Sequence, residues 1–251
     1  MVWAVLTMFK LALDAGHGLN TPGKRCLKSI DHNETREWFL NARICDKVVD
    51  LLEDYDGIAI LRVDDTTGSA DVPLATRVAV ANQWGSDFYL SVHHNAGIEG
   101  GNGGGIVAYC HPKAGKESVA WRDELYEALV EHTGLRGNRA TPKATADHHV
   151  TRNTKSAACL LELGFMDSRS DLPQILTEEY SVSCAEAIVD VIVRRAGLVK
   201  KKATDTPDAW AAAAWEKAKS TGVLDGTRPR DPLTRQEFAV VLSKLGLLVK
   251  N

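Results

Sequence analysis

No run of apolar residues in this 251-residue sequence approaches the roughly 20 that span a lipid bilayer, so we expect no membrane insertion. The opening segment MVWAVLTMF is apolar, but it lacks the basic start and the small-residue cleavage site of a secretory signal. We therefore expect synthesis in the cytoplasm without a signal peptide. The sequence also lacks a glycine-rich loop that would cradle phosphates, which argues against a nucleotide cofactor.

Cysteine is sparse and follows no recognisable pattern. The five cysteines are odd in number, and none falls in a CxxC spacing. This distribution is typical of reduced thiols in a protein made in the cytosol, and it argues against a disulfide framework.

The charge is weak overall and unevenly distributed. The net charge is -3, yet residues 200–251 carry 10 Lys and Arg against 6 Asp and Glu, which leaves 20 against 27 in residues 1–199. An acidic body argues against a nucleic-acid partner, whereas the basic end could meet an anionic polymer or could be ordinary surface scatter. Together with the polar, apolar-poor stretch KKKATDTP, the asymmetry predicts a domain at 1–199, a linker at 200–207 and a small helical module at 208–251.

Apolar periodicity in residues 1–199 alternates between strand and helix patterns, which predicts an α/β layer fold with a largely parallel sheet. The predicted strands are 10–14, 57–63, 87–93, 105–110 and 157–165, and the predicted helices begin near 33, 73, 114 and 178. In such a fold the ligand site lies beyond the carboxyl ends of the strands.

Polar residues with metal-binding or catalytic side chains stand at these strand ends. His17 follows the first strand, His93 and His94 end another, and Glu162 interrupts the apolar strand AACLLELGF. Each histidine alone could be a loop or strand-end residue, but a single glutamate among leucines has no simple structural explanation.

The helix predicted to begin near residue 33 adds a carboxylate. Glu37 lies close to the centre of its apolar stripe, whereas Glu34 falls at the stripe's edge. Alone, Glu37 could be a first-turn acid favoured by the helix dipole. Two imidazoles with one carboxylate, however, form a known zinc environment that keeps one position open.

Five ordered motifs give the sequence a family resemblance. LDAGHG, E-x-x-x-N from Glu37 to Asn41, PLATR-x-x-x-AN, DFYLSVHHNA and LLELGF resemble the zinc-dependent N-acetylmuramoyl-L-alanine amidases over about residues 10–197. The resemblance implies a mixed, mainly parallel sheet flanked by helices, and an enzyme that cuts bacterial peptidoglycan.

The resemblance also implies residue roles. It makes His17, Glu37 and His93 the ligands of one Zn²⁺ per chain, because the family pattern S-x-H-x-N selects His93 over His94. It makes Glu162 the catalytic carboxylate, which would take a proton from water and deliver it to the departing L-alanine amine. Asn95, the last residue of that pattern, is expected to contact substrate.

Other parts of the sequence depart from the family or extend it. The loop 19–36 carries less glycine than is usual, and His32, His148 and His149 match no family position. Residues 208–251 resemble one S-layer-homology-like, wall-binding unit of two helices, 208–221 and 234–246. So short a core is marginal alone, which leaves room for a homo-oligomer formed through this module.

The favoured interpretation is therefore a phage or prophage endolysin that is released through a holin-type route to act on the cell wall, and a bacterial autolysin is its nearest variant. The partners expected are peptidoglycan and anionic wall polymers. The alternatives are a zinc peptidase that cuts within the stem peptide and a non-catalytic wall-binding protein on the same fold.

Overall fold

The computed structural model describes residues 8–201, 206–227 and 233–247 and divides the chain into two compact units, Met1–Lys200 and Lys201–Asn251. The start of the apolar segment considered as a signal, residues 1–7, lies outside the described residues, as do residues 202–205 of the linker expected at 200–207. No helix in the described part of the chain is long and apolar enough to cross a membrane.

The first unit is built on a six-stranded sheet in the order β3-β1-β4-β7-β5-β6. Neighbours from β3 to β7 are parallel, β5 is antiparallel to β7, and β6 is parallel to β5. The predicted mixed, mainly parallel sheet is thus confirmed. The strands are β1 (Phe9–Ala15), β3 (Ile58–Arg62), β4 (Phe88–Asn95), β5 (Ile106–Cys110), β6 (Lys143–Thr145) and β7 (Ala157–Phe165).

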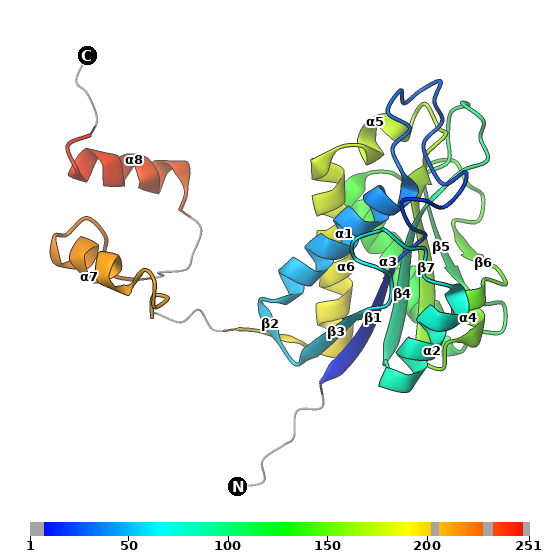
Figure 1. Ribbon diagram of the computed structural model, residues 1–251, viewed down its shortest axis with the longest axis horizontal. Helices are drawn as coiled ribbons and strands as arrows, with labels where there is room; N and C mark the ends of the chain where they lie inside the picture. Colours follow the sequence, from blue (N-terminus) through cyan, green and yellow to red (C-terminus); the bar gives the residue numbers. More distant parts are fainter. Residues whose placement is uncertain (1–7, 202–205, 228–232, 248–251) are drawn as a thin grey trace, which may run out of the picture. The chain divides into compact units, whose positions relative to one another are not determined.

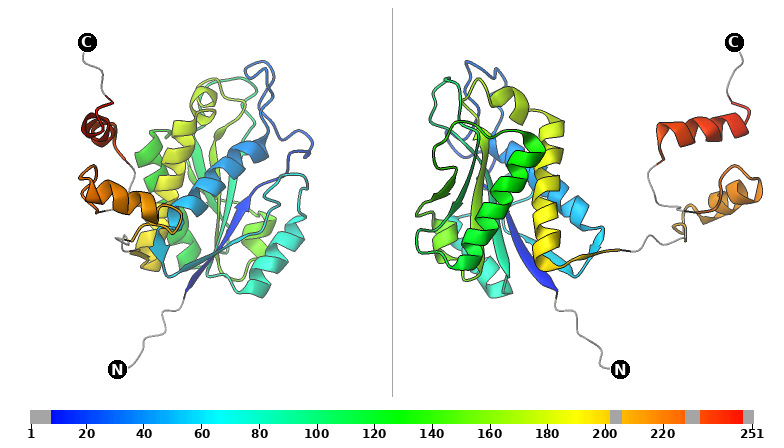
Figure 2. Two further views of the ribbon diagram at one scale, coloured as in Figure 1. Left: turned by 60° about the vertical axis from the view of Figure 1, so that its left-hand side comes forward. Right: turned by 180° about the vertical axis from the view of Figure 1, so that it is seen from behind.

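Helices cover both faces of this sheet, as Figures 1 and 2 show. Three long helices pack over the larger core on one face, and two shorter helices pack over a smaller core on the other. Burial on both faces explains why the central strands are continuously apolar. The first set is α1 (Glu37–Leu52), α3 (Lys116–Thr133) and α6 (Glu178–Ala196), the second is α2 (Leu74–Trp84) and α4 (His149–Asn153), and the single-turn α5 (Leu172–Ile175) follows β7.

Alternation along the central strands assigns their side chains to the two cores. In β4, Phe88, Leu90 and Val92 belong to the larger core, whereas Tyr89 belongs to the smaller core beneath α2 and α4. With a period of two, His93 therefore shares the face of Tyr89, and the same rule puts Glu162 of β7 on the face of Leu160.

Some predicted boundaries are wrong. The helix expected from about residue 33 begins at Glu37, after Arg36 in extended conformation. A two-stranded sheet of β2 (Tyr55–Asp56) and β8 (Val199–Lys200) was not predicted, and it holds the first residue of the expected linker in a strand pairing. Two- to five-residue elements such as β2, β8, α4 and α5 are too short to produce a periodic apolar pattern.

The second unit contains two short helices, α7 (Ala212–Ser220) and α8 (Arg235–Lys244). A capping box begins α8: the Thr234 hydroxyl accepts the amide of Glu237, and the Glu237 carboxylate accepts the amide of Thr234. None of the described residues of this unit is buried, and Trp210 is 89% exposed. The unit therefore has helices without an enclosed core.

Candidate active site

Four of the residues singled out in the sequence meet at one edge of the sheet. His17 follows the carboxyl end of β1, His93 and Glu162 lie towards the carboxyl ends of β4 and β7, and Glu37 is the first residue of α1. This is the edge at which a parallel α/β sheet offers a ligand site.

His17, Glu37 and His93 form a cluster in which one potential ligand atom from each residue lies within 4.8 Å of the others. Glu37 Oε1 is 3.3 Å from His17 Nε2 and 3.0 Å from His93 Nδ1. The Glu37 side chain is 1% exposed, and the ammonium of Lys24 stands 3.7 Å from its second oxygen. Burial alone would raise the pKa of Glu37, but the bonds from the two histidines outweigh burial and hold that pKa well below its ordinary value.

The absence of a side chain at Gly16 leaves room for the His93 ring. A Cβ atom on Gly16 would stand 2.0 Å from His93 Cε1, far inside van der Waals contact. The glycine before His17 therefore lets the two imidazoles approach, and their ring centres are 4.9 Å apart in an edge-to-face arrangement.

His94 has a different environment. Its Nδ1–H donates to Asn41 Oδ1 at 2.8 Å, and the Asn41 amide donates to the Gly16 carbonyl at 3.1 Å. Burial lowers the pKa of His94 to about 3, so this imidazole is neutral. The E-x-x-x-N spacing thus places the Glu37 carboxylate at the cluster and the Asn41 amide one helical turn later. Through its two hydrogen bonds, Asn41 links α1 to β4 and to the loop after β1.

Glu162 stands beside the cluster on the neighbouring strand. It is the register partner of His93 across β4 and β7 and lies on the same face of the sheet. Burial, assisted by the negative charge of Glu37 and opposed by His93, raises the pKa of Glu162 to about 7. Its Oε2 is buried and has no hydrogen-bond partner among the described residues. A carboxylate with a pKa near neutrality is suited to exchange protons with a substrate.

The cluster has the properties of a metal site. Ligands about 2.1 Å from a tetrahedral zinc ion lie about 3.4 Å from one another, which is close to the separations of Glu37 from the two histidines. Glu37 Oε2 is buried without a hydrogen-bond partner in the described part of the chain. A buried carboxylate with one oxygen facing two imidazoles and the other lacking a hydrogen bond fits a cation better than an apolar neighbour.

Glu34, the competing carboxylate in the sequence, does not join the cluster. It precedes α1 with a φ of 49°, and its carboxylate pairs with Arg25 at 3.2 Å and Lys28 at 3.4 Å. The expectation that Glu34 lies on the edge of the helical stripe is wrong, because the helix begins three residues later.

The other residues singled out in the sequence have surroundings of their own. Asn95 ends β4 after an irregularity in the β4–β7 register, and its side-chain oxygen accepts the amide of Ala96 at 2.9 Å. His148 packs edge-to-face on Tyr109 with ring centres 5.1 Å apart, while His32 is exposed. Burial, followed by the charge of His93, lowers the pKa of His148. Tyr109 was not singled out from the sequence, because an aromatic residue in an apolar strand gives no distinct signal.

A cavity of about 320 Å³ opens next to the cluster. Its lining includes His17 and His93, together with Asp71 and Pro73 from the segment before α2 and Leu74, the first residue of α2. The two histidines are therefore accessible from a pocket, as a substrate-binding centre requires.

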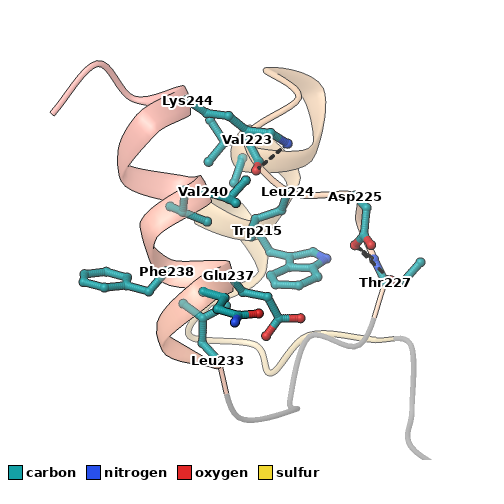
Figure 3. Close-up of a pocket in the computed structure, with 13 residues that line it drawn as sticks. Trp215, Val223, Leu224, Asp225, Thr227, Leu233, Glu237, Phe238, Val240 and Lys244 are labelled. Carbon is teal, nitrogen blue, oxygen red and sulfur yellow. Dashed lines mark hydrogen bonds between the residues drawn. The ribbon is translucent and has the colours of Figure 1, made fainter. Parts of the chain in front are cut away.

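The second unit has a groove of its own between α7 and α8 (Figure 3), with a volume of about 760 Å³. Trp215, Leu224 and Leu233 contribute apolar surface, and Lys244 donates to the carbonyls of Gly222 and Val223 at 2.9 and 3.2 Å. The Phe238 ring points away from the Trp215 indole and is half exposed. The groove is thus largely apolar and open to a ligand or a partner.

Comparisons with known proteins bear on the first unit. The chain is 30% identical over 198 residues to the N-acetylmuramoyl-L-alanine amidase CwlM of Bacillus licheniformis, an alignment that covers 78% of this chain and 72% of that protein. It is also 30% identical over 179 residues to the sporulation-specific N-acetylmuramoyl-L-alanine amidase of Bacillus subtilis strain 168, covering 71% of this chain and 64% of the relative.

A solved structure shows the same fold. The crystal structure of an N-acetylmuramoyl-L-alanine amidase from Clostridium difficile 630 superimposes with a TM-score of 0.66 at 24% identity, over 75% of this chain and 96% of the other. The N-acetylmuramoyl-L-alanine amidase family Amidase_3 matches residues 11–194, which include the whole His17–Glu37–His93 cluster and Glu162. The chain therefore belongs to the Amidase_3 family of N-acetylmuramoyl-L-alanine amidases.

Proposed function

We propose that this cell-wall amidase is zinc-dependent and hydrolyses the amide bond between N-acetylmuramic acid and L-alanine, with His17, Glu37 and His93 holding the ion. The observation that carries the proposal is the buried Glu37 carboxylate between two imidazoles, at 3.3 and 3.0 Å. Zinc bound there would act as a Lewis acid and lower the pKa of water. Three protein ligands leave a position open to the adjoining cavity, as catalytic zinc sites do.

Glu162 is proposed as the proton carrier of the reaction. Its position beside His93 and its pKa of about 7 allow a carboxylate oxygen to accept a proton from the attacking water. The same oxygen would then protonate the amide nitrogen as the C–N bond breaks, releasing the L-alanine amine. Asn95, at the end of the adjacent strand, is proposed to hydrogen-bond substrate.

The second unit is proposed to attach the enzyme to the wall. Two features support this role: the excess of basic residues in 200–251, and the open groove between α7 and α8. Basic side chains would meet anionic wall polymers, while the apolar groove would accept a sugar or a second copy of the unit.

The cellular role we propose is that of an endolysin or an autolysin that folds before it reaches the wall. All five cysteines lie in the described part of the chain, and all are free and buried. Folding in a reducing cytosol is compatible with this arrangement, because the fold needs no disulfide.

Digestion of purified peptidoglycan tests the proposed reaction. Protein stripped with a chelator should be inactive, stoichiometric zinc should restore hydrolysis, and mass spectrometry should find stem peptides with a free L-alanine amine and intact lactyl groups on the glycan. New ends inside the stem peptide would instead identify a peptidase. Full activity after metal removal would contradict the zinc mechanism.

A further inference from the structure

The backbone of His17 adopts a conformation that histidine rarely takes. Its φ is 68°, in the left-handed region where a side chain with a Cβ atom is disfavoured. The residue carries one of the three candidate ligand atoms, so the direction of its imidazole depends on how this backbone is held.

The peptide group between His17 and Gly18 is hydrogen-bonded at both ends. The Arg77 guanidinium donates through Nη2 to the His17 carbonyl at 2.9 Å. On the other side of the same peptide, the Gly18 amide donates to Thr21 Oγ1 at 3.0 Å. Rotation of the peptide plane would break both bonds together.

Asp71 joins these two contacts into a closed ring. Its Oδ1 accepts from Arg77 Nη2 at 3.0 Å, and its Oδ2 accepts from the Thr21 hydroxyl at 2.7 Å. Since the Thr21 hydroxyl accepts from Gly18 and donates to Asp71, each bond in the chain polarises the next.

Arg77 is itself fixed from several directions. Its side chain is 1% exposed, pairs with the buried Asp14, and donates to the carbonyls of Ala15 and Val72 at 2.8 Å each. The planar guanidinium can make these bonds at once, which a lysine ammonium on a flexible stem cannot reproduce. No role in the proposed chemistry accounts for a buried arginine that holds two carbonyls on either side of Gly16.

We propose that Arg77, Asp71 and Thr21 form a clamp on the His17–Gly18 peptide group, and that the clamp positions His17 for metal binding. The three are positioning residues, because they act through the backbone of His17 and none of them is a candidate metal ligand. The metal-binding part of the inference rests on the proposed zinc site. Partners that orient a metal ligand in this way contribute about 10–100-fold to metal affinity.

Amide hydrogen exchange on chelator-treated protein tests the clamp without any metal. The Gly18 amide should be protected in the unaltered protein, and Thr21→Val should speed its exchange about tenfold, whereas Thr21→Ser, which keeps the hydroxyl, should restore protection. A Gly18 amide that exchanges at the rate of an unstructured peptide, or equally in all three proteins, overturns the clamp.

Zinc affinity, measured by competition with a chromophoric chelator, tests what the clamp does. Arg77→Lys and Thr21→Val should weaken zinc binding about 10–100-fold. Arg62→Lys is the matched control, because Arg62 pairs with the buried Asp64 at 2.7 Å outside the cluster, and its zinc affinity should be unchanged.

The two results separate this inference from the proposed function. If the unaltered protein binds no zinc, the proposed zinc site is wrong. The hydrogen-exchange experiment alone then tests whether the clamp on the His17–Gly18 peptide group exists. If it binds zinc and folded Thr21→Val binds it equally tightly, the positioning role is wrong. Should Arg77→Lys fail to fold, the Thr21 variants still decide whether the clamp exists. The Thr21 side chain is only partly buried, so its replacement should be compatible with folding.

Discussion

Replacing Glu162 with glutamine should remove activity and, in the metal-free protein, increase stability. Glutamine keeps the size of the side chain and deletes none of the three candidate ligands, so the fold and the metal should be retained. The loss of the proton carrier should reduce turnover by about 10²–10⁴-fold. Hydrolysis of a soluble muropeptide, followed by chromatography, measures this loss.

The gain in stability follows from the pKa of Glu162. Burial first, together with Glu37, raises that pKa from 4.5 to about 7 in the folded protein. Because the folded state then holds the proton more tightly than the unfolded chain, stability is lost as the pH rises from about 4.5 through 7. At pH 8 the ionised carboxylate costs the folded state about 3 kcal/mol, and at pH 5 less than about 1 kcal/mol.

Thermal unfolding in the presence of a chelator tests the magnitude. The stability of Glu162→Gln relative to the unaltered protein should grow by about 2–3 kcal/mol between pH 5 and 8, which is about 5–10 °C in Tm for a unit of this size. Glu178→Gln is the control, since hydrogen bonding to Lys47 lowers the pKa of this exposed carboxylate. The difference in stability between Glu178→Gln and the unaltered protein should therefore not grow between pH 5 and 8. If the stability difference between Glu162→Gln and the unaltered protein stays constant between pH 5 and 8, the raised pKa of Glu162 is refuted. If Glu162→Gln retains turnover, the catalytic role of Glu162 is refuted.

Three further changes give distinct outcomes. His93→Ala should abolish zinc binding and hydrolysis while His94→Ala keeps the metal, as measured by metal analysis; the opposite pattern would mean that the wrong histidine of the pair has been assigned. Removal of residues 201–251 should leave hydrolysis of soluble muropeptides intact but weaken sedimentation with walls, and added salt should weaken attachment of the full chain if it is electrostatic; undiminished binding would exclude a targeting role. Native thiols should react slowly with a disulfide reagent at pH 8, because burial raises the pKa of Cys26 and Cys184 to about 12 and raises those of the other three, whereas five should react in denaturant; rapid native labelling would contradict their burial.

The sequence predicted the central sheet because its strands are long and apolar. The polar interruptions were equally informative: a glutamate inside AACLLELGF and a His-His pair at the end of DFYLSVHHNA mark the edge where the site forms. The apolar stripe predicted that Glu37 lies on the buried face of its helix, and the structure gives Glu37 and Asn41 partners at the same edge of the sheet.

The clamp around His17 could not be predicted from the sequence. Thr21 and Asp71 lie in polar loops and Arg77 in the PLATR motif, and only the fold shows that their polar atoms surround one peptide group. The left-handed backbone of His17 likewise has no sequence signal, because glycine rather than histidine marks such positions.

The start of α1 was misjudged for a related reason. Residues 33–36 continue the polar pattern of a helical first turn, yet their amides and carbonyls are engaged by other partners. Asp31 accepts the amides of Asn33 and Thr35, and the Thr35 carbonyl accepts the amide of Cys26. These loop contacts compete with helix formation and delay the helix until Glu37.

The most direct test of the zinc site is a crystal of the full chain measured with X-rays on either side of the zinc absorption edge. We predict one anomalous peak per chain, about 2.0–2.2 Å from a nitrogen of His17, a nitrogen of His93 and a carboxylate oxygen of Glu37, with Glu162 close by but not a ligand. A zinc-loaded crystal with no peak among these residues, or with its zinc bound through His94 or His148, would contradict the proposed site.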